Sequence, residues 1–268
     1  MQDGKYADAI EVLEAIAPIF EEAEDWEGYV ECLNEWCSIL WRSGNLKEAE
    51  KKANLSLNIV MNKLNKAPKI LAFIHINLGI INWIKGGYKK SIEFYKASLF
   101  IYIDIEDYAN IAVSYYNIGL VYFQLRDTQK AISFYQKSLK IRLSILEELH
   151  PHIAGCYNAL GNVYSYIENH QTAIKNYQKS LDIRLELFGE KHPDIAESYN
   201  NLGYAYTKKS VFKKAIYLLS KSLDITINIF SKNHLRTINT HIGLSIAYLK
   251  IKNYNKSLQH LNSKFIEF

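Results

Sequence analysis

The sequence predicts an all-α fold in which one helical unit is stacked repeatedly along the chain. A short phrase ending in an aliphatic residue and Gly returns every forty to forty-two residues, and twelve residues after each Gly comes a small residue. Only 4 prolines and no Gly/Ser-rich linker interrupt the chain. Together these observations indicate an array whose core forms between neighbouring units. The glycines are Gly79, Gly119, Gly161 and Gly203, and the small residues are Ser91, Ala131, Ala173 and Ala215.

Each unit is predicted to be a pair of antiparallel helices joined by a short turn. The first helix carries the Gly, and the second carries the small residue followed by an apolar stripe at helical spacing. Gly within a helix costs about 1 kcal/mol relative to Ala, so its recurrence indicates close packing of the partner helix over the missing side chain. Turns are expected at 85–87, 126–128 and 168–170, and Pro151 and Pro193 mark helix starts.

In chain order, we expect residues 1–20 to be the second helix of a truncated unit. Six helix pairs should follow, at about 28–62, 70–105, 110–147, 152–188, 194–230 and 236–268, in a single array over 1–268. Neither end offers a polar capping helix, which solenoids normally need. The chain is therefore expected to be a fragment of a larger protein, or to have its ends covered by a partner.

Charge is distributed unevenly along the chain. The net charge is +4, yet residues 1–35 hold eleven acidic residues against the single base Lys5. The acidic end could meet a basic partner or the basic body of another copy, or it could be a solvated face whose acids favour the start of the next helix.

No apolar run is long enough to span a bilayer and the N-terminus is not a signal peptide, so a cytoplasmic protein is expected. Cys32, Cys37 and Cys156 are expected to be free thiols in a reducing compartment.

The unit resembles the tetratricopeptide repeat (TPR). In that family an aromatic residue precedes Leu-Gly, an aromatic residue follows, and the second helix carries Ala and then another aromatic residue. Matching residues are Tyr115, Ile118, Gly119, Tyr122, Ala131 and Tyr135 in one unit, and Tyr157, Leu160, Gly161, Tyr164, Ala173 and Tyr177 in the next. The resemblance implies a right-handed superhelical solenoid. The long repeat is similar to those of kinesin light chains and of bacterial signalling proteins with TPR arrays.

The resemblance also implies that the first helices line a concave groove. Helical geometry then directs the residues around each Gly towards that groove, and many of them are Asn or aromatic. The predicted peptide-binding residues are Asn34, Trp41, Asn77, Trp83, Tyr116, Asn117, Phe123, Asn158, Asn162, Tyr166, Asn200, Asn201 and Tyr204.

The recurrent Asn residues suggest a mode of binding. An Asn amide offers donors and an acceptor that pair with the backbone of an extended peptide. The alternative is that these side chains bridge adjacent first helices and serve only packing. A clamp for a C-terminal carboxylate is not expected, because the groove holds only Arg42, Lys208 and Lys250 at distant units.

Two further sets of residues recur at the repeat period. His150, His192 and His234 are expected to be turn residues that precede helices, since equivalent positions in stacked units lie about 10 Å apart and cannot share a metal ion. Basic residues of the second helices are expected to form a stripe on the outer face, either solvated or attractive to an acidic partner or nucleic acid. They are Lys137, Lys179, Lys221, Arg142 and Arg184.

The sequence contains no phosphate-binding loop, nucleophile elbow or His-Glu metal helix. We therefore expect no enzyme activity, no cofactor and no metal. The favoured function is a protein-interaction scaffold that binds an extended peptide or a partner's helix. The alternatives are the sensor half of a signalling enzyme, such as a caspase-like protease or nucleotide-binding switch, and a receptor for small signalling peptides. A third alternative is nucleic-acid binding by the basic body, which predicts affinity that falls steeply with salt. The favoured partner is a protein or peptide, or the chain's own missing domain, rather than nucleic acid, and no membrane is expected.

Overall fold

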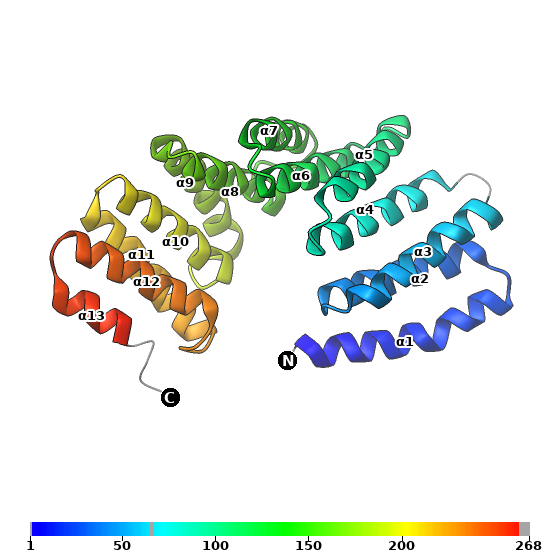
Figure 1. Cartoon of the computed structure of the whole chain (residues 1–268), viewed down its shortest axis with the longest axis horizontal. Helices are drawn as coiled ribbons and strands as arrows, with labels where there is room; N and C mark the ends of the chain where they lie inside the picture. Colours follow the sequence, from blue (N-terminus) through cyan, green and yellow to red (C-terminus); the bar gives the residue numbers. More distant parts are fainter. Residues whose placement is uncertain (1, 65–66, 263–268) are drawn as a thin grey trace. The chain divides into compact units, whose positions relative to one another are not determined.

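A computed structural model describes residues 2–64 and 67–262, with the backbone alone at residues 2–5. Thirteen α-helices and no strand occur in these residues (Figure 1). The helices are α1 Gln2–Glu22, α2 Trp26–Arg42, α3 Leu46–Lys63, α4 Pro68–Ile84, α5 Tyr88–Asp104, α6 Tyr108–Gln124, α7 Thr128–Ile145, α8 Pro151–Tyr166, α9 His170–Phe188, α10 Pro193–Lys208, α11 Phe212–Ile229, α12 Leu235–Lys250 and α13 Tyr254–Asn262.

The chain divides into two compact units, residues 1–134 and 135–268, with the boundary inside α7. In unit 1, helices that follow one another pack together from α1 to α6, and α2 also contacts α4. In unit 2, the same holds from α8 to α13, and α10 contacts α12. First helices of successive pairs therefore lie beside one another within each unit. The predicted all-α arrangement of consecutive helix pairs is confirmed.

Large side chains of the second helices pack onto the recurrent glycines. A Cβ atom added at Gly79 would lie 2.5 Å from the Tyr95 ring, and one added at Gly161 would lie 2.5 Å from the Tyr177 ring. At Gly203, the Leu219 side chain takes the same place. Real carbon atoms do not approach so closely, so only Gly lets these helices meet. The close approach predicted from the repeated glycines is confirmed.

Helix starts are fixed locally by side-chain caps. His150, His192 and His234 each accept a hydrogen bond from the backbone N–H two residues later. Asn45 and Asn169 cap second helices through their amide oxygens. Such caps satisfy N–H groups that have no partner within the helix. The prediction that the three histidines precede helices is confirmed, as is the placement of Pro151 and Pro193 at helix starts.

Of the helices in the described residues, none has the length and apolar character that crossing a bilayer requires. The three cysteines are buried free thiols, as predicted.

Candidate functional site: the face of the first helices

In unit 1 the first helices enclose a hollow of about 480 Å³. Its apolar lining includes Ile70 and the exposed Phe73 of α4. Asn34 of α2 and Asn110 of α6 add amide groups to the lining. Glu31, Glu35, Lys69 and Tyr102 complete it. A lining that combines apolar side chains with a few amides and charges suits a peptide side chain flanked by backbone.

In unit 2 a smaller hollow of about 210 Å³ lies between α10 and α12. Asn200 and Asn201 reach it from α10, and Asn239 reaches it from α12. The side chains of Asn200 and Asn239 make no hydrogen bond to another described residue, so their donors and acceptors are available to a ligand.

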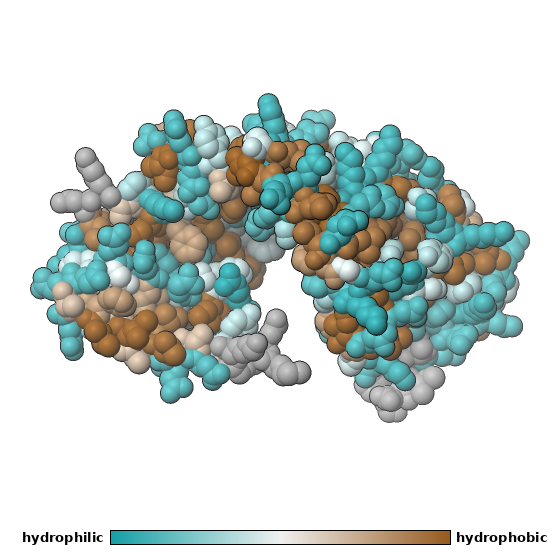
Figure 2. All heavy atoms as spheres, turned by 180° about the vertical axis from the view of Figure 1, so that it is seen from behind, coloured by the Kyte–Doolittle hydropathy of each residue, from teal (hydrophilic) through white to brown (hydrophobic). Residues whose placement is uncertain are grey.

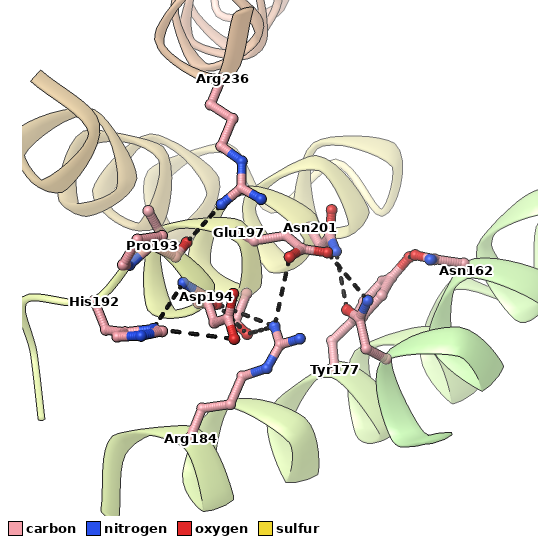
Figure 3. A network of polar contacts seen from close by, with 12 residues as sticks. Asn162, Tyr177, Arg184, His192, Pro193, Asp194, Glu197, Asn201 and Arg236 are labelled. Carbon is pink, nitrogen blue, oxygen red and sulfur yellow. Dashed lines mark hydrogen bonds and ion pairs between the residues drawn. The ribbon is translucent and has the colours of Figure 1, made fainter. Parts of the chain in front are cut away.

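Other predicted Asn residues connect neighbouring first helices. Asn158 of α8 donates to Glu197 Oε1 at 3.2 Å and accepts from Asn201 Nδ2 at 3.0 Å, both on α10 (Figure 3). Asn77 of α4 accepts from Ser38 Oγ of α2 at 3.4 Å. Buried or part-buried polar bonds of this kind hold one helix in register with the next. The structure thus gives Asn77, Asn158 and Asn201 the bridging role that the sequence left open as an alternative to peptide contact.

The remaining predicted site residues differ in exposure. Asn34 and Asn77 are buried, and their Oδ1 and Nδ2 atoms respectively find no hydrogen-bond partner among the described residues. Asn162 accepts from the Tyr177 hydroxyl at 2.8 Å, and burial raises the pKa of that hydroxyl above its ordinary value. Tyr166 and Tyr204 are exposed. The half-buried residues are Trp41, Trp83, Tyr116, Asn117 and Phe123. Their contact with a ligand stays a prediction.

Two arginines of the second helices were wrongly placed on the outer face by the sequence interpretation. Arg142 and Arg184 are only 5% and 8% exposed. Arg184 Nη1 donates to the Asp194 carbonyl at 3.0 Å and to Ser198 Oγ at 2.7 Å, and it lies 3.9 Å from Glu197 Oε2 (Figure 3). Each Arg lies eleven residues after the small residue, three helical turns along the same face, so helical geometry turns it inward. There it binds the backbone at the start of the next first helix.

The sequence interpretation also missed several lining residues, namely Ile70, Phe73, Asn110 and Asn239. They lie in the first turns of their helices, well before the recurrent Gly around which the groove was predicted. The signal was available, since a first helix contacts its neighbour along its whole length and not only near the Gly.

A separate hollow of about 520 Å³ lies between α11 and the segment that joins α9 to α10. Its charges are balanced, with Glu190 and Asp224 against Lys191 and Lys221. Within residues 2–64 and 67–262, no three His, Cys, Asp or Glu side chains gather in a way that could hold a metal ion.

A sequence profile decides the family. The tetratricopeptide repeat profile matches residues 69–144 and 152–226, which is more than half of the chain. The chain belongs to the tetratricopeptide repeat family. This confirms the resemblance drawn from the aromatic, Gly and Ala positions. No curated protein matches the sequence.

Solved TPR structures share the fold at low sequence identity. BtubC (BKLC) from P. vanneervenii is 22% identical and has a TM-score of 0.72 over 87% of this chain and 94% of its own. A Podosopora anserina protein of nearly identical TPR-like repeats, assigned to the kinesin light chains, is 17% identical with a TM-score of 0.64, covering 75% and 95% of the two chains. A STAND protein with a TPR sensor, PH0952 from Pyrococcus horikoshii, is 16% identical with a TM-score of 0.79 over 98% of this chain and 40% of its own.

Proposed function

We propose that this TPR protein binds an extended peptide, or a helix of a partner protein, on the face of its first helices. The observation that carries the proposal is the pair of hollows between successive first helices, one in each unit. Both combine amide groups with apolar or charged lining. In the unit 2 hollow the Asn200 and Asn239 amides can pair with peptide N–H and C=O groups, while Ile70 and Phe73 of the unit 1 hollow offer apolar surface to side chains.

The dimensions of a helix pair suit a short stretch of peptide. Neighbouring helices pack about 8–10 Å apart, and an extended peptide rises about 3.3 Å per residue. One pair of first helices therefore spans about three peptide residues. In unit 2, Asn200 on α10 and Asn239 on α12 stand on the two sides of that span. Two amides at this separation would fix both the position and the direction of the peptide backbone.

The test begins with peptides selected from a random library displayed on phage, using the full chain as bait. Their dissociation constants are then measured by fluorescence anisotropy with the chain, with an Asn200→Ala/Asn239→Ala variant, and with an Asn228→Ala control. Asn228 is an exposed amide on the second helix α11. Loss of two hydrogen bonds worth about 0.5–1.5 kcal/mol each should weaken binding about tenfold or more.

The control should bind like the parent chain, and all three proteins should show the same helical circular dichroism. The proposal fails if the Asn228→Ala control loses the peptide, which would direct attention to the hollow beside α11. The α10–α12 hollow is excluded if neither variant changes the dissociation constant, and the proposal as a whole fails if Phe73→Ala in the unit 1 hollow leaves it unchanged as well.

A second candidate function is sensing within a signalling protein. The fold similarity to the TPR sensor of the Pyrococcus STAND protein over 98% of this chain favours it. A sensor must pass a signal on, so a bound peptide should alter hydrogen exchange in helices that do not touch it. A plain scaffold should change exchange only in the helices that line the occupied hollow. Hydrogen exchange of the chain with and without the selected peptide separates the two functions.

A further inference from the structure

The second helices carry an isoleucine at one fixed position, ten residues after the small residue. It is Ile19, Ile59, Ile101, Ile141, Ile183 and Ile225 in the six successive second helices. Ile59 is 7% exposed and the four later ones are half-buried, whereas Ile19 of α1 is 64% exposed. Val12, two helical turns before Ile19 on the same face of α1, is 58% exposed, while Leu218, at the equivalent position of α11, is buried. This face of α1 is therefore more exposed than the matching faces of other second helices, and within residues 2–64 and 67–262 no helix covers it.

Figure 2 shows hydrophobic side chains along the edge of unit 1 formed by α1. Next to this edge lies an open hollow of about 590 Å³, lined by residues of α1 and α2. Leu13, Ile16 and Phe20 of α1 form its apolar side. Two turns of apolar surface beside a groove match the apolar stripe of one amphipathic helix.

The opposite side of the hollow is acidic. Glu27, Glu31 and Glu35 of α2 line it at intervals of four residues, and all three are exposed. This spacing sets the carboxylates in one row along the helix. Asp25 adds a fourth carboxylate, and none of the residues lining the hollow is basic. Such a row favours a ligand that carries Lys or Arg at the same helical spacing.

The repeat register explains what this row would meet. Glu31 and Glu35 lie six and two residues before Cys37, which replaces the recurrent Gly, just as Glu197 and Asn201 precede Gly203. In unit 2, Glu197 and Asn201 both bond to Asn158, which lies on the preceding first helix. Glu31 and Glu35 therefore occupy the two positions of α2 that correspond to Glu197 and Asn201 of α10. A first helix packed before α2 would bring its own counterpart of Asn158, three residues before its Gly, next to these two carboxylates.

We propose that the hollow between α1 and α2 binds a basic amphipathic helix of a partner protein, which occupies the place of a first helix against α1. Its apolar stripe packs on Leu13, Ile16 and Ile19, and its Lys or Arg side chains pair with Glu31 and Glu35. This site shares Glu31 and Glu35 with the unit 1 hollow and no residue with the α10–α12 hollow, so a failure here leaves the α10–α12 hollow as a peptide site.

The test uses a first helix of this chain as the probe. A fluorescent synthetic peptide with the sequence of Pro151–Tyr166 carries Asn158→Lys, which places a cation three residues before Gly161. Its binding to the full chain is followed by anisotropy. A Glu31→Lys/Glu35→Lys variant should weaken binding about tenfold or more. A Glu11→Lys/Glu22→Lys variant, with the same charge change on exposed residues of α1 outside the hollow, should bind nearly as the parent does.

A charge exchange completes the test. A matched peptide with Asn158→Glu should bind the parent weakly and the Glu31→Lys/Glu35→Lys variant well, which also shows that this variant is folded. The proposal is overturned if the cationic peptide does not bind, if both charge-reversal variants weaken it equally, or if Phe73→Ala, which alters only the unit 1 hollow, weakens it as much as Glu31→Lys/Glu35→Lys does. Sedimentation of the chain alone tests whether it self-associates. If it does, and if Glu31→Lys/Glu35→Lys abolishes the self-association, the occupant of the hollow is a second copy of the chain and the proposal of a partner protein is overturned.

Discussion

Helix α8 holds two glycines whose substitution by Ala should have opposite effects on stability. At Gly161 an added Cβ would lie 2.5 Å from Cδ1 and Cε1 of Tyr177. Carbon atoms pack comfortably at about 3.5–4.0 Å, so the ring or the helix must move by about 1 Å. Tyr177 is buried and its hydroxyl is tied to Asn162 at 2.8 Å. At Gly155, apart from its chain neighbours and the backbone of its own helix, no atom lies within 4 Å of the added Cβ.

The magnitudes follow from these surroundings. Ala stabilises a helix by about 1 kcal/mol relative to Gly, and Gly155→Ala should gain roughly that amount. Gly161→Ala gains the same helix propensity, but overpacking costs about 1–3 kcal/mol. Weakening the Tyr177 hydrogen bond adds about 1 kcal/mol. We expect Gly161→Ala to lower the free energy of unfolding by about 1–3 kcal/mol, about 2–4 kcal/mol below Gly155→Ala.

The assay is urea unfolding followed by circular dichroism at 222 nm, with both variants and the parent chain in one buffer. Because the two glycines share a helix, their difference isolates the contact with Tyr177. In a Gly161→Ala/Tyr177→Ala double variant the combined loss should be smaller than the sum of the single losses. The reasoning is refuted if Gly161→Ala unfolds at the same urea concentration as Gly155→Ala, or at a higher one.

Three further predictions concern buried polar groups. Arg184→Met should lower the free energy of unfolding by about 1.5–3 kcal/mol, because the Asp194 carbonyl and Ser198 hydroxyl lose a charged donor; urea unfolding measures it. Combining Asn158→Ala with Asn201→Ala should reveal a coupling of about 0.5–1.5 kcal/mol in a double-mutant cycle. Burial lowers the pKa of His75, so the unfolded chain takes up its proton more readily, and stability should fall as pH drops below about 6.5; His75→Phe should reduce the difference between unfolding at pH 7.5 and at pH 5.

Each of these has its own control. Lys175→Met, an exposed change on the helix that carries Arg184, should leave stability nearly unchanged, and equal losses from both would argue against the buried hydrogen bonds. Additive losses at Asn158 and Asn201 would mean that the bridge between α8 and α10 contributes nothing. An unaltered pH dependence in His75→Phe would show that another group governs the acid sensitivity.

The sequence predicted those features that depend on one residue type at one spacing. Gly161 opposite Tyr177 is an example, since only the absence of a side chain allows the approach, and the repeat displayed that absence four times. His192 was placed correctly before a helix because Pro193 follows it. These positions carry their structural reason within the unit itself.

Features that depend on a neighbouring unit were harder to predict. An Asn at a given position can cap, bridge or bind, and only the neighbouring helix decides which; Asn158 bridges because Glu197 and Asn201 stand opposite. Arg184 was misplaced because its charge suggested solvent, although its phase along α9 points inward to the backbone of α10. The charge of Arg184 predicted an exposed side chain and its position along α9 predicted a buried one, and the structure shows it buried.

The most direct test of the central claim is to locate a bound peptide. A library-selected peptide carrying a photo-activated cross-linker is irradiated with the full chain, and the modified residues are identified by mass spectrometry. Binding on the first helices predicts adducts on α10 and α12 around Asn200 and Asn239, or on α2 and α4 around Phe73. Adducts confined to the second helices α9 and α11 would contradict the account.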